Sequence, residues 1–232
     1  MSRPNGSAAG PPAADVRSLY PFLYARTSDL DAVVEQVRRS TVDKAREIIE
    51  LRAAVLAQDG TKLLDCAAAM AERFAAGARL LAFGNGGSST DAQDLVSLFL
   101  SPAGDARPLP AFSLTNDIAV ITALSNDIGF DVVFSRQIGA FGRATDIAVG
   151  LSTSGNSDNL VRGFDEAGRR GLLTVGIAGY DGGKMAELDS IDYLFVVPSP
   201  SVHRIQEAQT TLYHALWELT VTMLGGGPEV DR

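Results

Sequence analysis

The stretch at residues 80–93 constrains this chain more than any other. It opens with a short apolar run, Leu-Leu-Ala-Phe at 80–83, which predicts a buried strand. Gly84, Gly86 and Gly87 follow with an asparagine among them, so the backbone can turn tightly and approach a ligand closely. The next four residues, 88–91, carry side-chain oxygens that favour the start of a helix. We refer to residues 84–88 as the first turn.

A strand, a glycine turn and a helix N-terminus in this order present free backbone N–H groups to an anion, most commonly a phosphate. The stretch is not a P-loop, because no Gly-Lys-Ser/Thr follows, and its glycine spacing differs from the dinucleotide fingerprint. The alternative interpretation is a tight strand-to-helix turn that binds nothing.

A second turn of the same kind follows the apolar residues 146–151. Its sequence, Ser-Thr-Ser-Gly-Asn-Ser at 152–157, places four hydroxyl groups within six residues. Hydroxyl and N–H groups at a helix N-terminus bind phosphate oxygens without a lysine or arginine. The alternative is a helix cap with surplus hydroxyls. Two such turns predict a small phosphorylated ligand with hydroxyls of its own, and a sugar phosphate fits better than a nucleotide.

The hydrophobic pattern predicts two helices, at 29–57 and 61–76, separated by a break at Asp59-Gly60. Strands at 80–83, 111–114, 146–152, 172–178 and 193–197 then alternate with helices. This order predicts an α/β fold, a doubly wound parallel sheet of five strands with helices on both faces. Ligands of such sheets bind at the carboxyl ends of the strands, where the winding reverses.

Composition divides the chain further. Residues 1–15 are rich in Gly, Ala, Pro and Ser, which predicts a disordered tail, and residues 225–232 read as a second tail. Between them we expect an N-terminal segment and helix at 16–58, which packs against other subunits, and the sheet domain at 59–224.

The chain has 232 residues, a net charge of −8 and a pI near 4.8. This acidic balance argues against a general nucleic-acid surface or an anionic-membrane surface, but a small anion can still bind local N–H groups. No apolar run approaches the roughly 18 residues of a membrane span. A single cysteine, Cys66, excludes an internal disulfide and fits a cytoplasmic protein. His203 and His214 are the only histidines available for acid–base chemistry near neutral pH.

Five motifs occur together and in order: the first turn, Ser-Asn-Asp-Ile-Gly-Phe at 125–130, the second turn, Asp-Gly-Gly-Lys-Met at 181–185 and Arg-Ile-Gln-Glu at 204–207. The set resembles the sugar isomerase (SIS) domain, and within it the phosphoheptose isomerases. The resemblance implies a flavodoxin-like sheet, a homotetramer with active sites near subunit interfaces, and isomerisation of sedoheptulose 7-phosphate. It also implies a set of substrate-binding residues: Asn85, Gly86, Gly87, Ser88, Asp127, Ser152, Thr153, Ser154, Ser157 and Gln206.

Aldose–ketose isomerisation moves a proton between neighbouring carbons through an enediol, so it needs a base near the carbon and a group that manages the oxygens. The resemblance implies His214 and Gln206 as catalytic residues. It also shows three departures: Asp94 stands where the isomerases have a histidine, Leu98 where they have the glutamate base, and His203 where they tend to have an aspartate. A leucine cannot carry a proton, so we expect a nearby carboxylate to take over: Asp94, one turn before Leu98 on the same helical face, or Glu207 or Asp127 of the family motifs.

Some members of the family bind zinc at these positions, which leaves Asp94, Gln206 and His214 as candidate ligands here. Gln206 and His214 are eight residues apart, roughly 12 Å along one helix, so one ion reaches both only if the helix is interrupted or another subunit contributes. Two functions therefore stay open. The first is an isomerase with an altered base. The second is a non-catalytic sugar-phosphate-binding or scaffold protein with a protein partner.

Overall fold

The computed structural model describes residues 30–102 and 106–225. It divides the chain into two compact units, residues 1–46 and 47–232, and the sheet lies in the second. The predicted tail at 1–15 and residues 226–232 lie outside the described residues. The boundary that we predicted at residue 58 falls inside a continuous helix.

Five parallel strands form one sheet in the order β2-β1-β3-β4-β5, which confirms the predicted fold. Gly84 at the end of β1 is in register with Leu151 of β3. The strands are β1 Leu80–Gly84, β2 Ala111–Ser113, β3 Ile147–Ser152, β4 Leu173–Gly179 and β5 Tyr193–Val197. The helices are α2 Leu30–Ala75, α3 Gly87–Leu100, α4 Ile118–Asp127, α5 Val133–Phe141, α6 Asp158–Arg169 and α7 Val202–Met223, with 3₁₀-helices at Phe130–Val132 and Gly183–Glu187.

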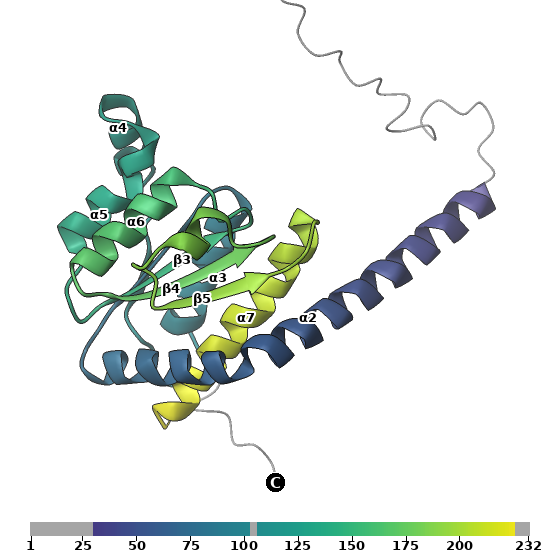
Figure 1. The fold of residues 1–232 in the computed structure, drawn as a ribbon, viewed down its shortest axis with the longest axis horizontal. Coiled ribbons are helices and arrows are strands. Elements are labelled where there is room, and N and C mark those ends of the chain that lie inside the picture. Colours follow the sequence, from purple (N-terminus) through teal and green to yellow (C-terminus); the bar gives the residue numbers. More distant parts are fainter. Residues whose placement is uncertain (1–29, 103–105, 226–232) are drawn as a thin grey trace, which may run out of the picture. The chain divides into compact units, whose positions relative to one another are not determined.

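Helices cover both faces of the sheet (Figure 1). Side chains alternate between the faces along each strand, so Leu80 packs with α2, α3 and α7 while Phe83 packs with α5 and α6. The ring of Phe83 lies 5.2 Å from the rings of both Phe134 and Phe164. Both cores are built from strand residues that are almost completely buried, as expected for a parallel sheet.

The prediction of two N-terminal helices was wrong. Helix α2 runs without interruption through Asp59 and Gly60. A glycine inside a helix costs about 1 kcal/mol relative to alanine. Burial of Val55 and Leu63 on either side offsets this cost. In addition, Asp59 accepts a hydrogen bond of 2.7 Å from Lys62, one turn later in the same helix.

Two further element boundaries differ from the prediction. The residue that caps α3 is Gly86, with no side-chain hydrogen bond, so the oxygens at 88–91 lie inside the helix and do not cap it. Helix α4 is capped by Asp117, whose carboxylate accepts hydrogen bonds from the N–H groups of Ala119 and Val120. It continues to Asp127, so Asn126 and Asp127, which belong to the 125–130 motif, are helical.

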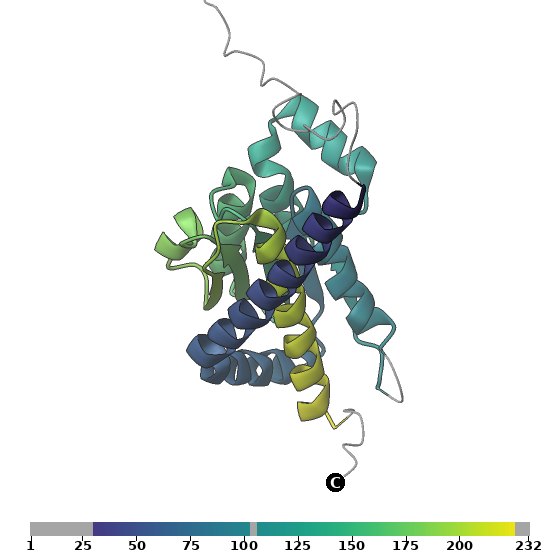
Figure 2. The same cartoon turned by 90° about the vertical axis from the view of Figure 1, so that its right-hand side faces the viewer.

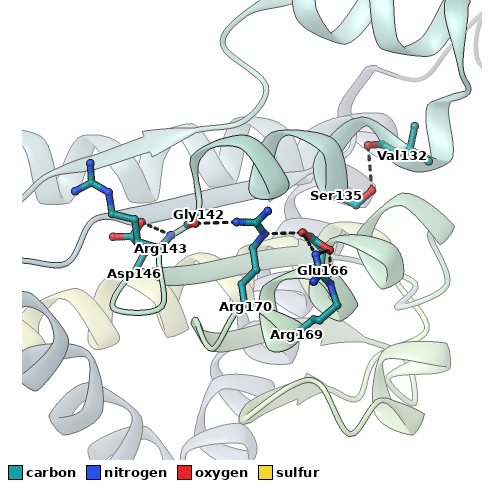
Figure 3. A network of polar contacts seen from close by, with 8 residues as sticks. All are labelled: Val132, Ser135, Gly142, Arg143, Asp146, Glu166, Arg169 and Arg170. Carbon is teal, nitrogen blue, oxygen red and sulfur yellow. Dashed lines mark hydrogen bonds and ion pairs between the residues drawn. The ribbon is translucent and has the colours of Figure 1, made fainter.

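Charged side chains tie together the loops at the amino ends of the strands. Asp146 accepts hydrogen bonds from the Arg143 N–H and from Arg79, whose Nη2 lies 2.5 Å from Oδ2. Figure 3 shows Arg170 between the carbonyl of Gly142 and the carboxylate of Glu166, which joins α5 to α6. These charges are satisfied within the scaffold. They lie at the end of the sheet opposite to the two turns.

Within the described part of the chain, none of the helices combines the length and the apolar character that crossing a membrane requires.

Candidate functional site

The two predicted turns meet where the winding of the sheet reverses. From β1 the chain proceeds to β2 on one side, and β3, β4 and β5 follow on the other, so the reversal lies between β1 and β3. The first turn leaves β1 and the second turn leaves β3, at the same edge of the sheet. A crevice at this position is where doubly wound sheets bind their ligands.

Glycines are required in the first turn for two reasons. Gly86 has φ +55°, a left-handed conformation that other residues adopt with strain. A Cβ on Gly87 would lie 2.1 Å from Nε2 of Gln206. The Gln206 amide is thus seated directly against the backbone of the first turn. This contact brings one predicted catalytic residue beside the predicted phosphate-binding turn.

The structure places two predicted side chains of the first turn, Asn85 and Ser88, against other parts of the protein. Ser88 is buried within the first turn of α3, and its backbone N–H bonds to the carbonyl of Asn85. The Asn85 amide forms two reciprocal hydrogen bonds of 2.9 Å with the amide of Asn159 on α6. Backbone groups around Gly86 and Gly87 are therefore candidate anion-binding groups at this turn, beside the predicted Ser88 hydroxyl.

The second turn presents hydroxyl groups around the start of α6. Ser152 Oγ accepts a hydrogen bond of 3.0 Å from the Gly155 N–H, and Ser154 Oγ accepts one of 3.2 Å from the Asn156 N–H. Each hydroxyl keeps its own proton to donate to a phosphate oxygen. Ser157 caps α6 without a side-chain hydrogen bond to the helix. Thr153 lies half-buried between them.

The loop after β4 braces the second turn. Asn156 Oδ1 accepts a hydrogen bond from the Lys184 N–H, and the Met185 N–H donates to the carbonyl of Gly155. The Asp-Gly-Gly-Lys motif thus supports the turn. Tyr180, at the start of this loop, has φ +53°, and such strain is typical of backbone near functional sites.

Helices α3 and α7 lie side by side (Figure 2). Polar side chains of the two helices meet where they pack, and we call Asp94, Tyr213 and His214 the polar seam. Asp94 Oδ2 accepts a hydrogen bond of 2.8 Å from the hydroxyl of Tyr213 and lies 3.4 Å from Nε2 of His214. Burial, reinforced by the Asp94 charge, raises the pKa of Tyr213, so the phenol keeps its proton and donates to Asp94. A hollow of about 370 Å³ opens beside His214, so its imidazole is accessible.

Asp91 is a functional candidate that sequence reasoning missed. Its Oδ2 is buried without a hydrogen-bond partner, and it lies one turn before Asp94 on α3. Burial and the nearby Asp94 charge raise the pKa of this carboxyl group, against the lowering effect of a hydrogen bond with Gln206. Asp91 and Asp94 are three residues apart and so share one helical face. This spacing is the sequence pattern that could have identified Asp91 as a candidate.

Tyr213 and Asn159 were missed for a different reason. Neither belongs to a local motif of acid–base or phosphate-binding residues. Their partners, Asp94 and Asn85, lie more than 70 residues earlier in the chain. Only the packing of α3 against α7, and of β1 beside β3, creates these contacts.

The comparison with known proteins agrees with this geometry. The SIS domain family model matches residues 45–179. The phosphoheptose isomerase of Aquifex aeolicus is 41% identical over 183 residues, which cover 77% of this chain and 93% of that protein. That of Nitratidesulfovibrio vulgaris Hildenborough is 42% identical over 189 residues, which cover 81% of this chain and 90% of that protein.

A solved structure agrees as well. The phosphoheptose isomerase GmhA from Neisseria gonorrhoeae has a TM-score of 0.70 at 35% identity, covering 82% of this chain and 99% of that chain. The chain belongs to the SIS domain family, among the phosphoheptose isomerases.

This SIS domain lacks a proton carrier at Leu98. The leucine is half-buried and packs against the core formed with α2 and α7. Asp127, a predicted substrate-binding residue, lies at the end of α4, which has no buried residue and projects from the layer of α5 and α6 (Figures 1 and 2). Its carboxylate accepts a hydrogen bond from Asn126 and contacts neither turn within the described residues.

The predicted zinc ligands do not form a closed site in one chain. Asp94 and His214 are close enough to share an ion, but Gln206 lies against Gly87, and α7 continues without interruption between Gln206 and His214. Among the described residues, no group of three or more His, Cys, Asp or Glu side chains is placed to hold a metal ion. Structural and catalytic zinc sites use at least three protein ligands. Zinc binding therefore stays a prediction, and no step below depends on it.

Proposed function

We propose that this protein is an aldose–ketose isomerase acting on sedoheptulose 7-phosphate or a similar sugar phosphate. The observation that carries the proposal is the contact of Asp94 on α3 with His214 on α7. On the same pair of helices, Gln206 of α7 contacts Gly87 of the first turn. A base and a phosphate-binding turn are the two parts that isomerisation of a sugar phosphate requires. The two relatives that match this chain over nine-tenths or more of their own length carry the name phosphoheptose isomerase.

In this proposal the two turns hold the phosphate. Backbone N–H groups at Gly86 and Gly87 and the hydroxyls at 152–157 bind its oxygens, and the helix N-termini of α3 and α6 favour its charge. Holding the phosphate end fixes the distance of the reacting carbons from α7. Such positioning supplies a large part of the rate enhancement of an enzyme.

His214 then acts as the base. It removes the proton from the carbon beside the carbonyl and returns it to the neighbouring carbon after the enediol has formed. The Asp94 carboxylate orients the imidazole and stabilises its positive charge while it holds the proton. The Gln206 amide, which lies against the first turn, binds the sugar near its phosphate end, and the hydroxyl proton of the enediol passes between the two neighbouring sugar oxygens.

We also infer a homotetramer located in the cytoplasm. Exposed apolar side chains on α4 and on the 3₁₀-helix that follows it support an assembly, with Ile118 69% and Phe130 53% exposed. In an assembly, Asp127 of one subunit can reach the turns of another, which fits its position at the end of a projecting helix.

Incubation of the purified protein with sedoheptulose 7-phosphate in deuterated water tests the proposed reaction. We expect an aldose product and deuterium at the substrate carbon. Absence of both, with intact folding, would overturn the proposal. The same assay after chelation and after zinc addition tests the zinc prediction.

Leu98 favours a second candidate function, a non-catalytic protein that binds sugar phosphates or acts as a scaffold. Under this hypothesis the double substitution Asp94→His and Leu98→Glu creates or raises isomerase activity without changing the affinity for the phosphate. Strong turnover by the unmodified protein that disappears in Asp94→Ala would dispose of this second function.

A further inference from the structure

A reciprocal amide pair joins the two turns of the candidate site. Nδ2 of Asn85 donates to Oδ1 of Asn159, and Nδ2 of Asn159 donates to Oδ1 of Asn85, each at 2.9 Å. Asn159 is only 3% exposed, so its amide has little access to solvent. An amide in this environment depends on its protein partner, because breaking the pair leaves buried polar groups unsatisfied.

The pair lies across the reversal of the sheet. Asn85 follows β1. Asn159 is the second residue of helix α6, which begins directly after the second turn. Strand pairing fixes β1 and β3 only as far as Gly84 and Leu151, where the two strands separate into different helices. Beyond that point the two hydrogen bonds set the separation of the turns.

Other contacts hold the remaining sides of the site but do not replace this pair. The loop after β4 braces the second turn through Asn156 and Gly155. Gln209 on α7 donates to the carbonyl of Ser152 and so supports the same turn from the side of α7. The first turn contacts α7 through Gln206 and Gly87. The amide pair joins these two braced halves directly.

We propose that Asn159 is a positioning residue for phosphate binding, which acts through Asn85 by fixing the distance between the two turns. A phosphate that receives hydrogen bonds from both turns needs a fixed spacing of the donors, and a displacement of about 1 Å is enough to weaken such a site strongly. The inference rests on the proposed function, because it concerns the same ligand. It assigns to Asn85 a role through Asn159 in place of the direct ligand contact that the sequence predicted.

A double-mutant cycle tests this role. The variants are Asn85→Ala, Asn159→Ala and the combination of both. Calorimetry measures the binding of inorganic phosphate and of sedoheptulose 7-phosphate, and steady-state kinetics give KM and kcat. Gln137→Ala is the matched control, because Gln137 is a buried amide on α5 whose hydrogen bonds go to the carbonyls of Leu114 and Val133, which belong to neither turn.

We expect Asn159→Ala to weaken the binding of both ligands and to raise KM by about tenfold or more, with a much smaller change in kcat. Because the pair acts as a unit, Asn85→Ala and the double variant should show the same loss as Asn159→Ala. Gln137→Ala should lower the melting temperature without changing ligand affinity.

Three results would overturn the inference. The first is unchanged affinity in Asn159→Ala. The second is a much larger loss in Asn85→Ala than in Asn159→Ala, which would show that Asn85 binds the ligand directly. The third is an equal loss in Gln137→Ala, which would show a general effect of destabilisation. If Asn159→Ala fails to fold, the less buried Asn85→Ala, compared with Asn159→Asp, decides by the same criteria. Failure of the unmodified protein to bind either ligand would instead contradict the proposed function.

Discussion

At the scale of single residues, close contacts explain why particular side chains stand at the site. Gly87 is the clearest case, because Gln206 fills the space that any Cβ would need. His214 is the second, because its Nε2 faces a carboxylate whose other contact is the buried Tyr213. Each of these contacts leads to a testable prediction.

Gly87→Ala should abolish or strongly weaken sugar-phosphate binding, because the new methyl group displaces the Gln206 amide from the first turn. Calorimetry with sedoheptulose 7-phosphate measures this effect. Gly60→Ala is the matched control, since its Cβ would approach only Leu56 at 3.7 Å. We expect the control to retain affinity and to gain up to about 1 kcal/mol in the free energy of unfolding. Retained affinity in Gly87→Ala would contradict the placement of Gln206.

His214→Gln should lower kcat by about 10²–10⁴, the usual contribution of a positioned general base. His203 is the natural control, because it is an exposed histidine near the N-terminus of the same helix, α7. His203→Gln should keep kcat within about twofold of the unmodified protein, as expected for a surface substitution. If both variants keep full activity, His214 is not the base.

At the scale of elements, the sheet is held at its two ends by different means. The carboxyl ends carry the turns of the site, while the amino ends are tied by ion pairs such as Arg79 with Asp146. Asp146 is 1% exposed, and burial alone would raise the pKa of its carboxyl group. Hydrogen bonds from Arg79 and Arg143 outweigh burial, so the pKa lies below its ordinary value of 3.8.

The lowered pKa of Asp146 predicts a loss of stability in acid. A carboxyl group with a depressed pKa in the folded state contributes stability that is fully present above its unfolded pKa and disappears as the pH falls through its folded pKa. Urea unfolding at about pH 7 and about pH 3 should therefore show a fall in the free energy of unfolding. Asp146→Asn should reduce that fall and also destabilise the protein by about 3–5 kcal/mol at neutral pH, because Arg79 loses its partner.

Glu35→Gln is the control for this effect. Glu35 pairs with Arg38 and Arg39 on the exposed surface of α2, where ion pairs contribute little. An equal response of the two variants to acid would contradict the role assigned to Asp146.

At the scale of the whole molecule, exposed apolar surface predicts assembly. Helix α4 has a strongly apolar sequence but buries none of its residues, and Ile118 and Ile128 are more than half exposed. Burying such surface contributes roughly 25 cal/mol per Å², so association of copies is favoured.

Light scattering after size exclusion should give about four times the chain mass of 24.4 kDa. The double substitution Ile118→Asp and Phe130→Asp should produce smaller species and lower activity together, if Asp127 reaches a neighbouring site. A monomer with full isomerase activity would contradict both the tetramer and the shared site.

The sequence alone determined the order of the elements and predicted where a ligand binds. Short apolar runs are local patterns, so they predicted the five strands. The glycine and hydroxyl residues at 84–88 and 152–157 predicted the two turns, and these turns together with the later motifs indicated the family. Local patterns also misled: Asp59-Gly60 resembles a helix end, but burial of its neighbours keeps α2 continuous.

Only the tertiary structure decided which side chains meet. The pairing of Asn85 with Asn159, the contact of Tyr213 with Asp94 and the seat of Gln206 against Gly87 join residues that are far apart in sequence. The physical reason is that such contacts depend on how helices pack against the sheet and on each other, and no local propensity encodes that packing. The sequence therefore located the site, and the packing of β1, β3, α3, α6 and α7 assembled it.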